Sequence, residues 1–103
     1  MNRGDVCWVE LPSEKRRPAV VLTRTEAIPV MRKVTVAFLT GTVRDIPTEV
    51  RLGPDDGLPK ECVASLDNLR AINRALLSEP IAGLSGPRMH EVCKALAIAT
   101  GCD

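Results

Sequence analysis

The stretch EKRRPAVVLTR (14–24) joins a run of three basic residues to an apolar, valine-rich segment. That segment is typical of a β-strand buried on both faces. A residue before proline is held out of helical geometry, so Arg17 should be extended, and Pro18 is tolerated because it stands at the start of the strand. Side chains alternate between the two faces of a strand, so Arg17 shares a face with Ala19 while Arg16 points to the other. One guanidinium should therefore face the core side of a sheet, unless both reach solvent from the strand end.

Similar segments on either side of this stretch predict a small β-rich domain. Strand-like runs lie at 5–11, 33–42, 47–52 and 61–72, with a last short one at 79–84. In the first of them, alternation places Val6 and Trp8 on one face and Cys7, Val9 and Leu11 on the other. The segment GPDDGLP (53–59) is dense in turn residues and is expected to be a solvated loop.

The carboxyl-terminal segment changes period and predicts a helix. Its apolar residues follow helical spacing at Met89, Val92, Cys93, Leu96 and Ala97. Ser85 is a candidate N-cap, Pro87 suits the first turn, and Gly101 can end the helix. Residues 1–103 are thus expected to form a single domain, mainly β with a C-terminal α-helix packed on a curled antiparallel sheet or partly open barrel.

Composition removes several classes of function. The net charge is only +1, so any basic site must be local. The sole aromatic residues are Trp8 and Phe38, which argues against a binder that stacks bases on a row of rings. No apolar run approaches the roughly 18 residues of a membrane span. Four cysteines without a Cys-x-x-Cys pair and a single histidine predict free thiols in a reducing cytoplasm and neither a metal nor another cofactor.

Two features of the strand region suit a phosphate ligand. Arginine offers a planar fork of donors that matches phosphate and stays charged at any working pH, which makes Arg17 the first candidate. The second is Thr40, which ends the strand at 33–42 and is followed by Gly41, where the backbone can approach a ligand closely. A threonine at this place is also an ordinary end to a strand, so neither feature identifies the site without the other.

Four stretches taken in order resemble the MazF/PemK/Kid toxins. RGDVCWVEL (3–11) looks like their amino-terminal signature, KRRPAVVLTR (15–24) like their Arg-Pro strand, and VAFLTGTVRDIPTEV (36–50) like their third strand with its terminal threonine, in the short-loop, actinobacterial type. PKECVASLDNLRAI (59–72) resembles their segment with an acidic residue, an amide and an arginine, and the final helix also agrees. The order and spacing of these loose motifs are together specific.

The resemblance implies the toxin of a type II toxin–antitoxin module. The fold would be an SH3-like small barrel with a terminal helix, assembled as a homodimer. The activity would be metal-independent, sequence-specific cleavage of single-stranded RNA, giving a 2′,3′-cyclic phosphate or 3′-phosphate and a 5′-hydroxyl. The partner would be a MazE-type antitoxin with an acidic tail. The family's catalytic arginine and threonine fall on Arg17 and Thr40, and an acidic residue linked to activity in some members falls on Asp67.

Two departures qualify this transfer of roles. Those members carry a second arginine where this chain has Ser65, and many relatives have a longer loop before the Arg-Pro pair than PSEK (12–15). The lone His90 falls in the helix, so the reaction must depend on charge stabilisation rather than on paired histidines. The general base stays open between Asp67, by family position, and Glu14, by its nearness to Arg17.

The remaining polar residues of these motifs are candidates for RNA contact. Lys15, Arg16 and Arg44 are expected to line the RNA backbone. Asn68 and Arg70 could contribute hydrogen bonds to splayed bases. Two other functions stay open from the sequence: a gyrase-directed toxin of the CcdB type, and a non-catalytic SH3-like interaction module, which would normally need an aromatic groove.

Overall fold

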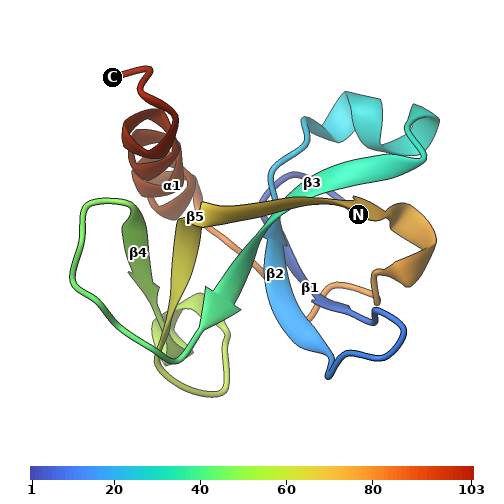
Figure 1. Ribbon diagram of the computed structural model, residues 1–103, viewed down its shortest axis with the longest axis horizontal. Helices are drawn as coiled ribbons and strands as arrows, with labels where there is room; N and C mark the ends of the chain where they lie inside the picture. The colour runs from blue at the N-terminus through green and yellow to red at the C-terminus, as the bar shows by residue number, and fades with distance from the viewer.

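The computed structural model describes all 103 residues and contains one six-stranded antiparallel sheet and one α-helix (Figure 1). The strands are β1 (Asp5–Val9), β2 (Arg17–Val21), β3 (Lys33–Thr40), β4 (Glu49–Leu52), β5 (Cys62–Asn73) and β6 (Ala82–Gly83). The helix is α1 (Gly86–Thr100), and three short 3₁₀ helices are η1 (Thr25–Val30), η2 (Pro54–Asp56) and η3 (Arg74–Leu76). The strand order across the sheet is β4-β5-β3-β2-β1-β6, and every pairing is antiparallel.

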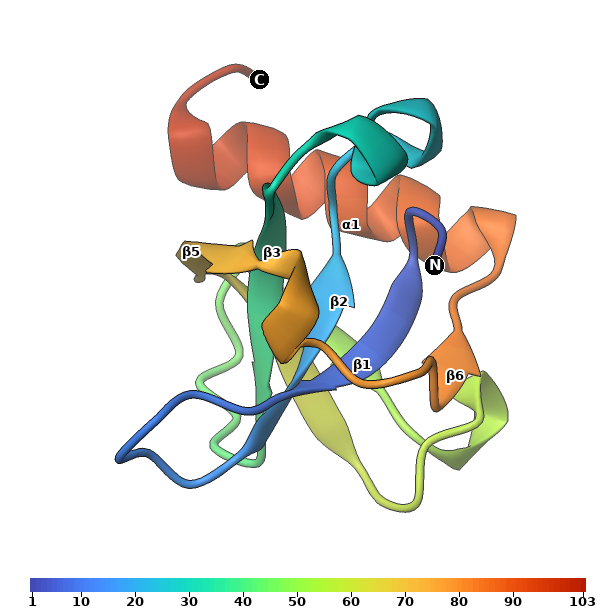
Figure 2. The same cartoon turned by 90° about the vertical axis from the view of Figure 1, so that its right-hand side faces the viewer.

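The sheet buries an apolar cluster on each of its faces, as the alternation within the strands requires. Val6 and Val20, which pair across β1 and β2, belong to the cluster that includes Val92 of α1. Cys7 and Ala19, the next pair along, belong to the second cluster, which also holds Phe38. The two faces predicted for the first strand are therefore confirmed. The helix packs on one face only, as Figure 2 shows. The Cys7 face, which α1 does not cover and on which Ile28 of η1 packs, is called the open face.

A register shift in β5 curls the sheet into a half-barrel. Ala37 of β3 pairs with Leu69 and Leu39 pairs with Ala64, so residues 65–68 of β5 all lie opposite Phe38. Extra residues in one strand bend it and increase its twist. The first part of β5, before the bulge, pairs with β3 along one edge and with β4 along the other. The result is the predicted mainly β, SH3-like architecture with a C-terminal helix.

The terminal helix has the predicted ends, and three residues of its predicted apolar face, Met89, Val92 and Leu96, pack on the core. The Ser85 hydroxyl accepts a hydrogen bond from the Arg88 amide at 3.3 Å, and Gly101 ends the helix in a left-handed conformation. The fully buried positions are Val92 and Ala95, whereas Cys93 is exposed. Helical spacing allowed a face through either Ala95 or Cys93, because both neighbour Val92, and contact with the sheet decides between them. At 15 residues, α1 lacks the length and apolar character of a bilayer-spanning helix.

Two connections differ from the sequence-based expectation. Residues 25–30 form η1, which no strand or helix pattern indicated, and it buries Ala27 and Ile28. The turn at 53–59 is not simply solvated: the Asp56 side chain is 6% exposed, and its carboxylate accepts a hydrogen bond from the Arg88 guanidinium at 2.8 Å. A residue 32 positions away supplies this partner, so no local pattern could reveal it.

Candidate active site

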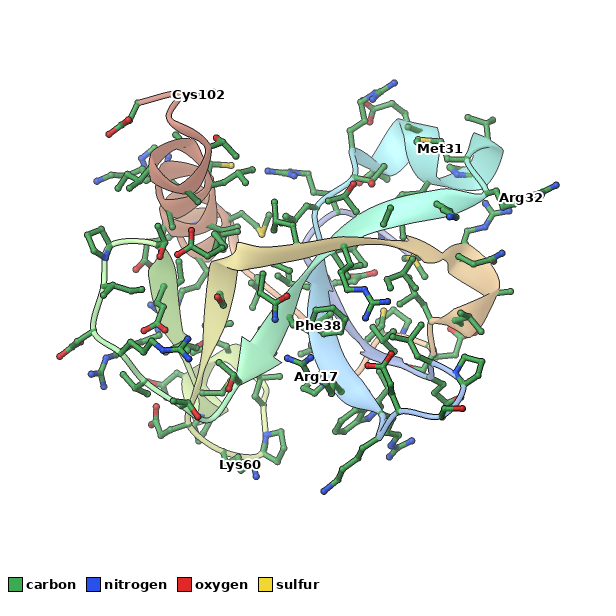
Figure 3. All side chains as sticks on the ribbon, viewed as in Figure 1. Arg17, Met31, Arg32, Phe38, Lys60 and Cys102 are labelled. Carbon is green, nitrogen blue, oxygen red and sulfur yellow. The ribbon has the colours of Figure 1, made fainter.

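Arg17 begins β2 opposite Val9, and its side chain lies on the open face of the sheet. The guanidinium carbon lies 4.3 Å from the centroid of the Phe38 ring, and Figure 3 shows the two side chains together at the middle of the molecule. The guanidinium group of Arg17 donates no hydrogen bond and forms no ion pair within the protein. Its five N–H donors are therefore available to a ligand while the plane of the guanidinium is held by the ring.

Thr40 ends β3 two residues after Phe38 and shares its face. Ala19 and Phe38 form the last pair of the β2–β3 ladder, and Arg17 and Thr40 each lie two residues beyond that pair, at the same end of the two neighbouring strands. The half-buried Thr40 hydroxyl oxygen accepts a hydrogen bond from the Thr42 amide at 3.2 Å, which leaves its own O–H free to donate. A side chain built on Gly41 would meet nothing within 4 Å, so the space beside this strand end is open. The order of the strands thus places the two predicted phosphate-binding residues on one face, at the same end of neighbouring strands.

Arg70 and Glu14 form a second polar pair at the same place. Arg70 pairs with Val36 on the open face, and its guanidinium carbon lies 5.9 Å from the Phe38 centroid. One of its nitrogens is 3.7 Å from a carboxylate oxygen of Glu14. Both side chains are about half exposed, so this pair contributes little to stability and can separate for a ligand. Two arginines from different strands and one carboxylate therefore gather around a single ring.

Asp67 and Asn68 lie in the bulged part of β5, and no hydrogen bond or ion pair joins them to this group. Asp67 accepts a 2.5 Å hydrogen bond from the Thr48 hydroxyl and has no polar contact with Arg17 or Arg70. Ser65, which replaces the arginine of some family members, is 8% exposed. Of the two carboxylates left open by the sequence, the structure places Glu14 in contact with the arginine group and Asp67 in contact with Thr48.

The other predicted RNA-contacting residues, Lys15, Arg16 and Arg44, are exposed. Lys15 is exposed in the loop before β2. Arg16 points to the opposite face, as expected, where it stacks on Trp8 at 4.4 Å and lies 3.6 Å from Glu10. Arg44 is exposed in the loop after Thr40, where its amide donates to Glu49 at 2.9 Å.

The cysteines lie outside this site, and none forms a disulfide. Burial raises the pKa of the Cys7 thiol to about 11, with a smaller effect from Asp5. Burial and then the Asp56 carboxylate raise the pKa of Cys62 as well. Both residues therefore stay as neutral thiols at physiological pH and are poor nucleophiles.

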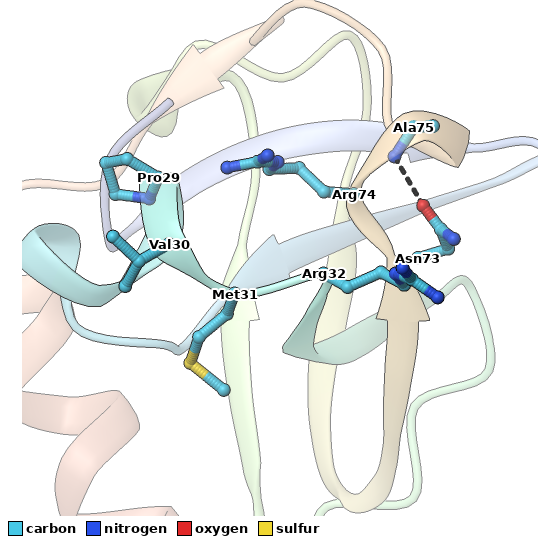
Figure 4. Close-up of a pocket in the computed structure, with 7 residues that line it drawn as sticks. All are labelled: Pro29, Val30, Met31, Arg32, Asn73, Arg74 and Ala75. Atoms are coloured by element: carbon cyan, nitrogen blue, oxygen red, sulfur yellow. Dashed lines mark hydrogen bonds between the residues drawn. The ribbon is translucent and has the colours of Figure 1, made fainter.

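A shallow pocket of about 420 Å³ lies elsewhere, between η1 and η3 (Figure 4). Asn73 accepts the amide hydrogen of Ala75 at 2.9 Å in this region, and Arg74 donates to the Ile28 carbonyl at 2.6 Å. None of the residues lining this pocket is a predicted site residue. His90 is exposed on α1 and also lies outside the arginine group.

Sequence reasoning missed the part played by Phe38. It was noted only as one of two aromatic residues, yet it lies beneath two guanidinium groups. Alternation along the strand could have indicated this role, because it puts Phe38 on the same face as Thr40. Pairing of β2 with β3 then puts Phe38 on the face of Arg17 as well.

Comparison with known proteins places this arrangement in a family. The model of a family described as "PemK-like, MazF-like toxin of type II toxin-antitoxin system" matches residues 2–100. The chain is 39% identical over 102 residues to the probable endoribonuclease MazF5 of Mycobacterium tuberculosis, a match that covers 98% of this chain and 94% of the relative. The chain therefore belongs to the PemK-like, MazF-like toxins of type II toxin–antitoxin systems.

Solved structures agree with this assignment. Mycobacterium tuberculosis toxin MazF-mt6 superposes with a TM-score of 0.88 and 32% identity, over 96% of this chain and 98% of that one. An endoribonuclease solved in complex with its cognate antitoxin, from a mycobacterial species, superposes with a TM-score of 0.87 and 26% identity, covering 100% of this chain and 97% of that one.

Proposed function

We propose that residues 1–103 act as one domain, the endoribonuclease toxin of a type II toxin–antitoxin module, which cleaves single-stranded RNA and so stops translation and growth. The observation that carries this proposal is Arg17, an arginine without any polar partner, held on a ring at the open face beside Thr40. The family assignment and the relatives named as endoribonucleases support it.

The proposed reaction uses the ribose 2′-hydroxyl of the substrate as the nucleophile. The 2′-oxygen forms a bond to the neighbouring phosphorus as the bond from phosphorus to the 5′-oxygen breaks. A base accepts the 2′-hydroxyl proton, and the 5′-oxygen leaves as a hydroxyl after protonation. The products are a 2′,3′-cyclic phosphate, which water can open to a 3′-phosphate, and a 5′-hydroxyl end.

Arg17 and Thr40 would stabilise the phosphorane-like transition state. The Arg17 fork can donate two hydrogen bonds to the oxygens on which negative charge grows, and it does so from a fixed plane. The Thr40 hydroxyl can donate a third and fix the orientation of the phosphate. A guanidinium gives up its proton reluctantly, so Arg17 serves mainly as a source of positive charge.

Glu14 is the better placed of the two candidate bases. It lies 3.7 Å from Arg70, which shares the Phe38 ring with Arg17, whereas the Asp67 carboxylate is engaged by Thr48 at 2.5 Å. Asp67 is then assigned to holding the start of β4, and the experiment that decides between the two is given in the Discussion.

The RNA backbone would run across the exposed cations around Arg17, namely Lys15, Arg16 and Arg44, with Asn68 and Arg70 available to bases or to a phosphate. Binding to a non-cleavable RNA should weaken as salt rises, by a slope of about 0.7 per neutralised phosphate in a plot of log affinity against log salt. Lys15→Gln and Arg44→Gln should each flatten that slope by about 0.7. Fluorescence anisotropy over a series of salt concentrations measures it, and an affinity independent of salt would remove these residues from the RNA path.

The implied partners follow from the same surface. A MazE-type antitoxin with an acidic segment could cover the arginine group, and a structural relative carries its cognate antitoxin. We also infer that the protein works in the cytoplasm as a homodimer and needs neither a metal nor another cofactor.

Incubation with a long single-stranded RNA in EDTA tests the activity. We expect discrete cuts whose 5′-hydroxyl ends accept a labelled phosphate from polynucleotide kinase without prior phosphatase treatment. Thr40→Ala, purified in parallel, should cut far more weakly and so controls for contaminating ribonucleases. An absence of cutting across RNAs of diverse sequence would contradict the proposal, and a gyrase-directed toxin or a non-catalytic module would give that result.

A further inference from the structure

Two guanidinium groups lie over one buried phenylalanine ring. Phe38 is 1% exposed, and the guanidinium carbons of Arg17 and Arg70 are 4.3 Å and 5.9 Å from its centroid. The arginines come from β2 and β5, the strands on either side of β3. Residues 65–68 of β5 bulge away opposite Phe38, so the ring has no paired residue across the β3–β5 ladder. The ring is therefore the surface that both arginines share.

The Phe38 ring fills part of the core and also orders the Arg17 side chain. An arginine side chain has several rotatable bonds, and ordering it for catalysis is costly in entropy. Arg17 lacks the carboxylate or carbonyl partner that usually orders an arginine, so the face of Phe38 is the contact that sets its plane. Attraction between a guanidinium and the negative face of an aromatic ring supplies that contact and leaves the N–H edge unused.

We propose that Phe38 is a positioning residue for RNA cleavage, which sets the plane of Arg17 and draws Arg70 to the same phosphate. This inference rests on the proposed function. Arg70 then contributes a second guanidinium to the phosphate at the centre of the reaction, after its loose contact with Glu14 opens, instead of reading a base. Two positive groups held near each other suit a phosphate that gains negative charge in the transition state.

The expected effect is on the rate of the chemical step. An arginine released from the ring still attracts RNA, but it reaches the productive orientation less often. Phe38→Leu fills a similar apolar space without offering an aromatic face, and it should lower kcat by about 5- to 30-fold with little change in KM. Trp8→Leu is the matched comparison, because it removes the ring beneath Arg16, which is proposed to contact the RNA backbone and not the reacting phosphate. Any loss should therefore appear in KM, and kcat at saturating RNA should stay within about twofold.

The composition of the chain offers a sharper test. Phe38 is the only phenylalanine, so biosynthetic incorporation of fluorinated phenylalanines changes this position alone. Each added fluorine draws electron density from the ring face and weakens its attraction for a cation, while the shape of the side chain changes little. We expect kcat to fall stepwise with fluorination while KM and the melting temperature stay nearly constant, a pattern that a purely structural role would not produce.

The fluorinated series tests the role of Phe38 separately from RNA cleavage itself. If the parent cuts RNA and kcat is constant along the fluorinated series, Phe38 only fills the core and the inference is wrong. If the parent does not cut, the proposed function fails, and the ¹⁹F resonance of 4-fluorophenylalanine still tests the geometry by titration with an RNA methylated at every 2′-oxygen. A shift that disappears in Arg17→Ala supports the positioning of Arg17 by Phe38, and an unchanged resonance overturns it.

Discussion

Arg17→Ala should lower kcat for RNA cleavage by about 10²–10³-fold, the usual cost of losing one well-aimed donor to a developing anion. The effect should be large because Arg17 is the one arginine in the group that has no carboxylate near it, and its charge is available in full to the phosphate. Arg17→Lys should recover only part of the rate, since an ammonium group lacks the planar fork and stacks less well on Phe38. Single-turnover cleavage of an end-labelled RNA measures both variants.

The control for this experiment is another arginine at the surface. Arg24 lies after β2 and makes only a 3.9 Å contact with Glu26, so Arg24→Ala should cut like the parent. Thermal melting should show that all three variants keep the native fold, because none of them removes a buried apolar group. If Arg17→Ala retains the parental rate, the reacting phosphate is bound elsewhere on the sheet.

The second large effect on kcat is expected from removing the proposed general base, Glu14. Glu14→Gln should lower kcat by about 10²-fold or more, within the 10²–10⁴ range typical of general-base catalysis. The glutamine keeps the size of the side chain and its contact with Arg70 but cannot accept the proton. Asp67→Asn should change kcat by less than about threefold, because the amide oxygen can still accept the hydrogen bond from Thr48.

These two carboxylate variants form a direct comparison. Rates are measured at saturating RNA, so that any change in binding caused by the lost charge does not enter kcat. The reverse result, a large loss in Asp67→Asn and none in Glu14→Gln, would assign the base to Asp67. Large and equal losses would mean that the reaction needs both carboxylates.

Much of the fold follows from local pattern. Apolar alternation and β-branched residues located the main strands, and the cap signals at Ser85 and Gly101 located the helix ends to within a residue. The opposite directions of Arg16 and Arg17 also follow from alternation, and the structure confirms them through contacts with Trp8 and Phe38. Such features depend on neighbours within a few positions, which is the range over which sequence patterns carry information.

The rest depends on tertiary contact. The bulge at 65–68 is a break in the pairing of β5 with β3, and no spacing in the sequence marks it. Arg70 and Glu14 are 56 residues apart, and their contact exists only because β5 crosses the open face near the loop before β2. One edge of the α1 face differs from the prediction for a similar reason, since the position of the sheet buries Ala95 and leaves Cys93 exposed.

The β1–β2 ladder determines which changes of length the protein can tolerate near its arginine group. Val9 pairs with Arg17, so the segment 10–16 is a loop whose two ends are fixed by strand pairing. Residues can be added to or removed from it without rotating Arg17 off the Phe38 ring, whereas one residue inserted after Pro18 would exchange the directions of the two arginines. Natural variation and laboratory libraries that alter this segment but keep a carboxylate at the position of Glu14 can therefore change which RNA is selected while Arg17 and the proposed base stay in place.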